Sequence, residues 1–150
     1  MLGLIQRVSS ASVSIENRPQ GNIDQGILLL LGVEKNDGQD NADQLLRKIL
    51  NYRIFNDELG KMNLSLNDIG GDLLVVSQFT LAADTKKGMR PSFSSAAPPE
   101  PAEALYDYFL KQAQIECQGR VASGEFGADM QVSLVNDGPV TIMLDSQLRE

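Results

Sequence analysis

The sequence contains no histidine and only one cysteine, Cys117. Without histidine, the chain cannot hold a Ser-His-Asp triad, a Cys-His dyad or a metal site with a histidine ligand. A single cysteine excludes an internal disulfide and, in practice, a structural zinc site, and it suits a reducing compartment. Any catalysis must therefore rest on carboxylates, hydroxyls, Lys or Arg, backbone dipoles or groups of the substrate itself.

Long hydrophobic runs are also absent. The longest, ILLLL at 27–31, is far too short to cross a bilayer, and the opening MLGLIQR does not have the pattern of a signal peptide. With 150 residues, of which 42% are hydrophobic, we expect one domain over residues 1–150 that buries about 70% of its unfolded surface. We expect it to be cytoplasmic, with no membrane partner.

The net charge of −7 at first sight argues against a polyanionic partner. Whole-chain charge governs solubility and long-range attraction, however, and a local patch can oppose it. Residues 86–90, KKGMR, place three cations, Lys86, Lys87 and Arg90, in five positions without an acid. A solvated loop is the simpler interpretation of this stretch, and a contact for a polyanion is the alternative.

Hydrophobic periodicity predicts more strand than helix. We expect strands at 2–15 (one bent strand or two), 26–33, 72–76, 130–135 and 140–144, a hairpin over 53–66, and a turn at 17–22. One helix is expected from an Asp40 cap to residue 52, and a second from the prolines at 98–101, with these buried positions: Ala42, Leu45, Leu46, Ile49, Leu105, Phe109, Ala113. The apolar run at 72–76 predicts a central strand. The fold class expected is α/β with a mixed sheet.

Polar residues follow this central strand directly, in the sequence Ser77-Gln78-Phe79-Thr80. Polar side chains at the carboxyl end of a buried strand commonly lie at the mouth of a site, and backbone N–H groups freed there can bind an oxyanion. The alternative is an ordinary strand end whose hydroxyls satisfy local backbone groups.

A second polar stretch, Asn136-Asp137-Gly138-Pro139, separates the last two expected strands. The simple interpretation is a tight turn whose proline starts an edge strand. A cis Gly-Pro bond is the alternative, but only about 5–6% of X–Pro bonds in folded proteins are cis, so the local sequence alone does not support it.

The combination of SQFT at 77–80 with NDGPVT at 136–141 resembles the bacterial branch of the D-aminoacyl-tRNA deacylase family. The likeness continues in the family's order through LIQRV at 4–8, LGV at 31–33, YRIF at 52–55, GKMN at 60–63, MRPSF at 89–93 and ADMQV at 128–132. No single motif is specific, whereas the ordered set covers nearly the whole chain. The only visible departures are a few extra residues after Leu144.

This resemblance implies a three-layer β-β-α sandwich with mixed and antiparallel sheets, working as a homodimer with active sites at the subunit interface. It implies hydrolysis of the ester that joins a D-amino acid, or glycine, to the 3′-terminal adenosine of tRNA, including glycine misattached to alanine tRNA. No metal, other cofactor or DNA partner is implied.

The resemblance also implies roles for the Gly-Pro stretch. The Gly138-Pro139 bond is expected to be cis and to reach into the partner subunit's site, where its two carbonyl oxygens face the amino group and Cα of the substrate. An L-residue would drive its Cβ into this backbone, whereas glycine would not. Arg7 is expected to hold the stretch by hydrogen bonds to backbone oxygens.

In the same way, the backbone N–H groups of Phe79 and Thr80 are implied to be the oxyanion donors, with the attacking water held by the substrate's 2′-OH. A nucleophilic Thr80 hydroxyl ranks second, because it needs a nearby base and the sequence names none. The implied substrate contacts are these: Ser77, Gln78, Phe126 and Met130 in the pocket, and Lys86, Lys87 and Arg90 at tRNA phosphates. Two other interpretations stay open, a non-catalytic binding module and a hydrolase of free D-amino acid esters.

Overall fold

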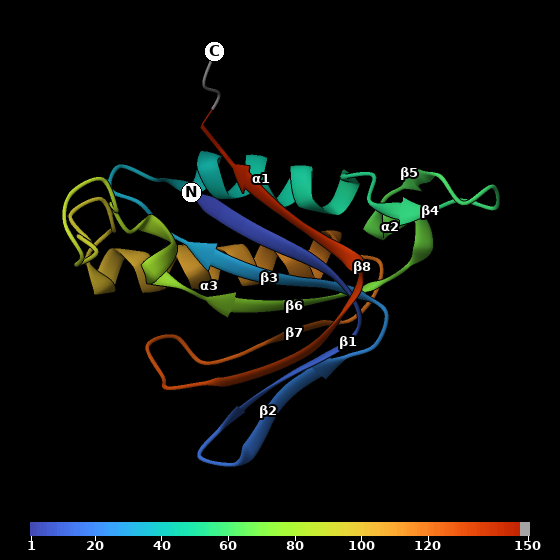
Figure 1. Cartoon of the computed structure of the whole chain (residues 1–150), viewed down its shortest axis with the longest axis horizontal. Coiled ribbons are helices and arrows are strands. Elements are labelled where there is room, and N and C mark those ends of the chain that lie inside the picture. Colours follow the sequence, from blue (N-terminus) through green and yellow to red (C-terminus); the bar gives the residue numbers. More distant parts are fainter. Residues whose placement is uncertain (148–150) are drawn as a thin grey trace.

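A computed structural model of the chain describes residues 1–147 (Figure 1). Its strands are β1 Leu2–Ile15, β2 Arg18–Ile23, β3 Gly26–Gly32, β4 Phe55–Asn56, β5 Met62–Leu64, β6 Asp72–Ser77, β7 Val121–Ser123 and β8 Gln131–Asp145. Its helices are α1 Gln39–Asn51, α2 Leu66–Ile69, the 3-10 helix η1 Phe79–Ala82 and α3 Pro99–Glu116. No helix within residues 1–147 is both long and apolar enough to span a membrane.

The long strand β1 organises the main sheet. Its first half pairs antiparallel with β3, its second half pairs antiparallel with β2, and β8 pairs antiparallel with both halves. Strands β6 and β7 add to β3 in parallel, which gives the order β2-β1-β3-β6-β7 with β8 beside β1. The sheet is therefore mixed, as predicted, and β6 lies in its interior between β3 and β7.

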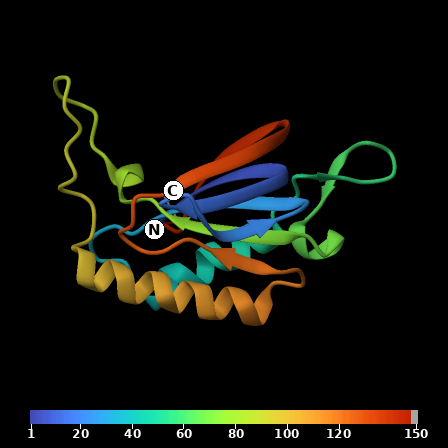
Figure 2. The ribbon, with the colours of Figure 1, turned by 90° about the horizontal axis from the view of Figure 1, so that it is seen from below.

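Strand β3 and residues 73–76 of β6 are apolar because each face of these strands covers a separate core. Alternate side chains such as Leu29 and Val75 pack beneath α1 and α3. Their neighbours Leu28 and Leu74 face the other way, where Val13 of β1 covers them. The second half of β1 and β2 curl over this face, so the sheet is nearly closed, and the helices lie on its outer side (Figure 2). The fold is a mixed α/β fold with few helices.

Both long helices bury the predicted stripes. The expected cap of α1 is wrong, because Gly38 occupies the cap position and Asp40 lies in the first turn. The Asn41 side chain accepts a hydrogen bond from the Gly38 N–H at 2.9 Å, which satisfies the cap without a carboxylate. The predicted hairpin over 53–66 is confirmed by the antiparallel pairing of β4 with β5.

Two other expectations are wrong. Residues 17–22 do not form a turn: β2 covers most of them, and the turn before it is made by Glu16 and Asn17, both with positive φ. The last two expected strands are a single strand, β8, that pairs with β1 on both sides of residues 137–140. Strand β7 and the short helices α2 and η1 were not predicted.

Candidate active site

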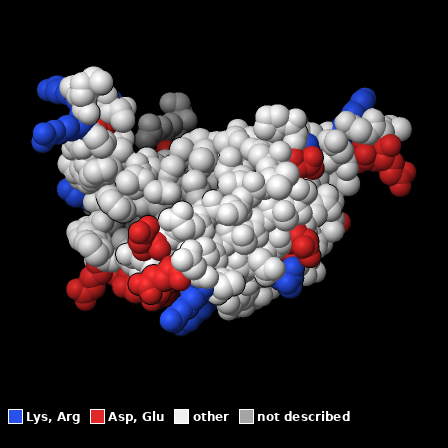
Figure 3. All heavy atoms as spheres, turned by 60° about the horizontal axis from the view of Figure 1, so that its bottom comes forward, with Lys and Arg blue, Asp and Glu red and all other residues white. Residues whose placement is uncertain are grey.

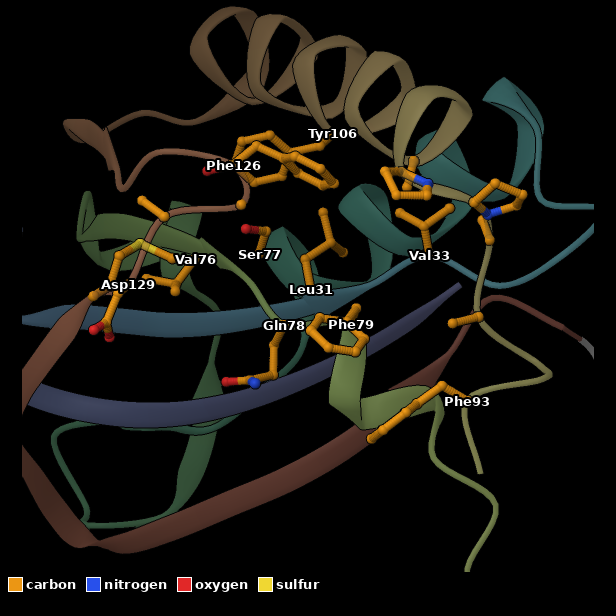
Figure 4. Close-up of a pocket in the computed structure, with 18 of the residues that line it drawn as sticks. Leu31, Val33, Val76, Ser77, Gln78, Phe79, Phe93, Tyr106, Phe126 and Asp129 are labelled. Atoms are coloured by element: carbon orange, nitrogen blue, oxygen red, sulfur yellow. The ribbon is translucent and has the colours of Figure 1, made fainter. Parts of the chain in front are cut away.

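A cavity of about 640 Å³ opens where β3 and β6 end (Figure 4). Its walls come from the last residues of these strands, the start of η1, residues 93–99, the first turns of α3 and residues 126–132. The lining is mostly apolar, with Ser77, Gln78 and Asp129 among its few polar side chains. Such a cavity has the size and character of a small-molecule site, and it lies at the strand ends where parallel sheets commonly place one.

The chain turns sharply from β6 into η1 at the mouth of this cavity. The Gln78 N–H still donates to the Leu31 carbonyl at 2.8 Å, and the Gln78 carbonyl then accepts the first bond of η1 from Leu81 at 3.2 Å. The N–H groups of Phe79 and Thr80 lie in the first turn, where a helix leaves donors unused. Neither of them donates a hydrogen bond to any group within residues 1–147.

The Thr80 side chain does not line the cavity. Its hydroxyl oxygen accepts a hydrogen bond from the Gln78 side-chain amide. Within the described residues the Thr80 hydroxyl has no bond to a carboxylate, lysine or arginine that would take its proton. The hydroxyl is thus not set up as a nucleophile, and the unused N–H of Thr80 belongs to the residue that follows Phe79, the last residue of this segment to line the cavity.

Aromatic rings form two sides of the cavity. Phe79 and Phe93 meet edge to face with ring centres 5.2 Å apart, and Figure 4 shows them opposite Tyr106 and Phe126. The latter two rings are tilted, with centres 5.7 Å apart. Phe126 and Met130, the two residues expected to contact the substrate from this segment, both line the cavity.

Tyr106 and Phe93 were not among the predicted site residues. The Tyr106 hydroxyl donates to the Val75 carbonyl in β6 at 3.2 Å, and the side chain is buried. Burial raises the pKa of Tyr106 to about 12. The hydroxyl therefore remains a protonated donor at neutral pH.

The second predicted stretch lies outside this cavity. In β8, Asn136 pairs with Val8 and Thr141 pairs with Gln6, so that residues 137–140 lie opposite Arg7 alone. The four residues bulge out of the strand, and the Gly138-Pro139 peptide within the bulge is cis. We call residues 137–140 the β8 bulge.

Two side chains hold the β8 bulge. Asn136 closes its base, since its Oδ1 accepts from the Val140 N–H at 2.9 Å. Arg7 is buried beneath it: Nε donates to the Asp137 carbonyl at 2.8 Å, and Nη1 donates to the Ile54 carbonyl at 2.7 Å. Arg7 thus makes the kind of backbone contacts expected of it, whereas Gly138 and Pro139 are exposed and do not line the cavity of their own chain.

The three predicted cations lie on the loop between η1 and α3. Backbone bonds between Asp84 and Ser92, at 2.7 and 3.0 Å, pin the root of this loop. Lys86, Lys87 and Arg90 are exposed beyond that root, where the loop projects from the body (Figure 2). Figure 3 shows Lys and Arg side chains gathered at this end of the molecule.

The fold and the cavity define an α/β protein with a ligand-sized, mostly apolar site at the ends of two parallel strands. Residues 4–145 match the family described as D-Tyr-tRNA(Tyr) deacylase, and the chain belongs to this family. It is 68% identical over 144 residues to a D-aminoacyl-tRNA deacylase of Pseudoalteromonas translucida (strain TAC 125), with 96% of this chain and 99% of the relative covered. A D-aminoacyl-tRNA deacylase of Stutzerimonas stutzeri (strain A1501) is 64% identical over 146 residues, which are 97% of this chain and 100% of the relative.

Two solved structures are also similar. One, titled "c-Myc DNA Unwinding Element Binding Protein", has a TM-score of 0.91 and 43% identity, covering 98% of this chain and 99% of the other. A second, titled "Structural Analysis of a probable eukaryotic D-amino acid tRNA deacylase", has a TM-score of 0.80 and covers 96% and 98%. At 17% identity, the second likeness concerns the fold alone.

Proposed function

We propose that the protein hydrolyses the ester that joins a D-amino acid to the 3′-terminal adenosine of tRNA. The observation that carries this proposal is the pair of unused N–H groups of Phe79, which lines the cavity, and of Thr80, which follows it in the first turn of η1. Relatives that match nearly the whole chain are named for this reaction. The cytoplasm, where charged tRNA is used, is the proposed place of action.

The proposed chemistry needs no histidine. An aminoacyl ester is a reactive acyl group, and attack by water places negative charge on its carbonyl oxygen. Two backbone donors aimed at that oxygen stabilise it, each by about 2.7–4 kcal/mol. We propose that the substrate's own 2′-OH holds the attacking water, and that the 3′-oxygen of the tRNA leaves with a proton.

The cavity suits the terminal nucleoside. A purine is flat and largely uncharged, and it stacks on aromatic side chains. We propose that Ser77, Gln78, Phe126 and Met130 hold the terminal adenosine, so that the ester lies at the mouth beside η1. The amino-acid side chain then points outward, and many D-residues are accepted.

We propose a homodimer of three-layer β-β-α domains in which the β8 bulge of each chain enters the partner's site. Two observations support it. Within the described residues, strand β8 pairs only with β1, so its other edge has no partner strand. In addition, the β8 side chains Val135 and Met143 are about half exposed. Figure 3 also shows a broad face without charged side chains at its centre.

In this arrangement the carbonyl oxygens of Gly138 and Pro139 face the amino group and Cα of the substrate. An L-residue would press its Cβ into backbone that Arg7 holds in place, whereas a D-residue presents hydrogen. Glycine has no Cβ and is cleaved as well, which includes glycine on alanine tRNA. The loop cations Lys86 and Lys87, with Arg90, are proposed to contact tRNA phosphates.

The test is deacylation of matched D-tyrosyl-, L-tyrosyl- and glycyl-tRNA by the purified protein. We expect rapid release of D-tyrosine and glycine, and release of L-tyrosine at the uncatalysed rate. Tight binding without turnover would instead indicate a binding module. Equal rates on D-tyrosyl-tRNA and on a simple D-tyrosine ester would indicate a small-molecule hydrolase.

A further inference from the structure

Two walls of the cavity meet at one backbone oxygen, the carbonyl of Val75 in β6. It accepts hydrogen bonds from the Tyr106 hydroxyl and from the Gly124 N–H, both at 3.2 Å. Val75 lies two residues before Ser77, in the segment that enters η1. Gly124 lies two residues before Phe126, in the segment that forms the opposite wall. This oxygen therefore ties the two walls together.

Tyr106 reaches this junction from the helix layer. Its hydroxyl bonds to β6 while its ring packs on Phe126, so one side chain contacts both walls (Figure 4). The second wall is folded tightly beside it, because a Cβ on Gly124 would lie 2.4 Å from the sulfur of Met130. Only 2% of Tyr106 is exposed, so solvent does not compete for the hydroxyl.

We infer that Tyr106 is a positioning residue for deacylation. Through its hydrogen bond to the Val75 carbonyl, it fixes the direction in which the N–H groups of Phe79 and Thr80 point. This inference rests on the proposed function. The amides stabilise the oxyanion only while they point at it, and small displacements of such donors lower the rate of the chemical step. Binding of the nucleoside depends mainly on the rings, which the hydroxyl does not alter. Loss of the hydroxyl therefore lowers kcat more than it raises KM.

Tyr106→Phe is the test variant, because it keeps the ring and the buried volume. The Val75 carbonyl keeps its bond from the Gly124 N–H, so we expect the variant to fold. Tyr108→Phe is the matched control: it lies on the same helix, but its hydroxyl donates to Asp43 of α1 at 2.8 Å, away from the cavity. With D-tyrosyl-tRNA, we expect kcat of Tyr106→Phe to fall about 3- to 10-fold, the effect of one neutral hydrogen bond, with KM changed less than about twofold.

A second measurement reports on position without activity. Amide hydrogen exchange in peptides covering 77–82 and 124–130 should be faster in Tyr106→Phe than in the wild type, and unaltered in Tyr108→Phe. An unchanged kcat, an equal loss in both variants, or unchanged exchange in Tyr106→Phe would overturn the inference. A wild-type chain that leaves D-tyrosyl-tRNA intact would refute the proposed function instead, and the exchange data would still decide whether Tyr106 holds the two walls together.

Discussion

Removal of the Arg7 guanidinium should destabilise the fold and release the β8 bulge. Arg7→Met keeps most of the buried aliphatic volume but loses both hydrogen bonds, to Ile54 and to Asp137. The Ile54 bond is buried, so its carbonyl is left without a partner, at a cost of about 1–3 kcal/mol. The Asp137 carbonyl is partly exposed and can bind water instead, which reduces its cost to about 0.5–1.5 kcal/mol.

Together the two terms give a loss of about 1–4 kcal/mol in the free energy of unfolding, because removal of the buried charge offsets part of them. For a chain of this size, each kcal/mol lowers Tm by about 2–4 °C. Urea and thermal unfolding measure both quantities, at one fixed protein concentration because a dimer's stability depends on it. The stability of Arg7→Lys should lie between those of the wild type and Arg7→Met. A lysine ammonium keeps the charge, but it cannot reach both backbone oxygens as the planar guanidinium does.

Gln6→Ala is the matched control, because Gln6 precedes Arg7 in β1 and donates an exposed hydrogen bond to Thr141, the residue that follows the bulge. It should change stability by less than about 0.5 kcal/mol. Assayed well below its Tm, Arg7→Met should also lose D-tyrosyl-tRNA activity or begin to cleave L-tyrosyl-tRNA, whereas Gln6→Ala should do neither. Stability of Arg7→Met equal to that of the control, with unchanged selectivity, would refute the reasoning.

Three further changes test other parts of the site. Thr80→Ala should keep activity within about tenfold, since only side-chain hydrogen bonds are lost, and a fall to the uncatalysed rate in a folded variant would make the hydroxyl the nucleophile. Replacing Lys86, Lys87 and Arg90 with Gln should weaken binding of all charged tRNAs alike and lower the salt slope by roughly 2–3; an unchanged slope would place the RNA elsewhere. Gly138→Ala should cost about 1–3 kcal/mol of stability, because φ is +138° and the new Cβ would lie 2.9 Å from a side-chain carbon; urea unfolding at wild-type stability would contradict this.

The parts of the fold that the sequence predicts are those with a strong apolar period. Helices α1 and α3 each bury one face, and the apolar run of β6 is buried on both faces. In each case a few neighbouring residues carry the whole pattern, so the sequence predicts the element. Strand β2 shows the opposite case. Its Pro19 and Gly21 favour a turn, yet β2 forms because β1 supplies partners, and an edge strand tolerates proline.

The sequence indicates only the part of the cavity that directly follows β6. Ser77, Gln78 and Phe79 follow a strand that is recognisable on its own, and all three line the cavity. Tyr106 was missed because Leu105, one residue earlier, already explains the burial of α3 at that turn. A helix that covers both a core and a cavity buries more of its surface than one stripe of residues. A tyrosine next to the stripe indicates this wider buried face, because a buried tyrosine hydroxyl usually has a hydrogen-bond partner, here the Val75 carbonyl.

At the β8 bulge, the local sequence predicts a turn that the structure does not form. Apolar residues on both sides of Asn136-Asp137-Gly138-Pro139 fit a hairpin and an interrupted strand equally well, because both give the same local alternation. The difference lies in the partner: in a hairpin the two halves pair with each other, whereas here both pair with β1. Only Arg7, the one charged residue of β1, distinguishes them in the sequence, since a buried guanidinium in a strand needs backbone oxygens that a regular ladder does not offer. The bulge supplies such an oxygen, the Asp137 carbonyl. The bulge thus explains how β1 can bury Arg7, and Arg7 explains what holds residues 137–140 in place.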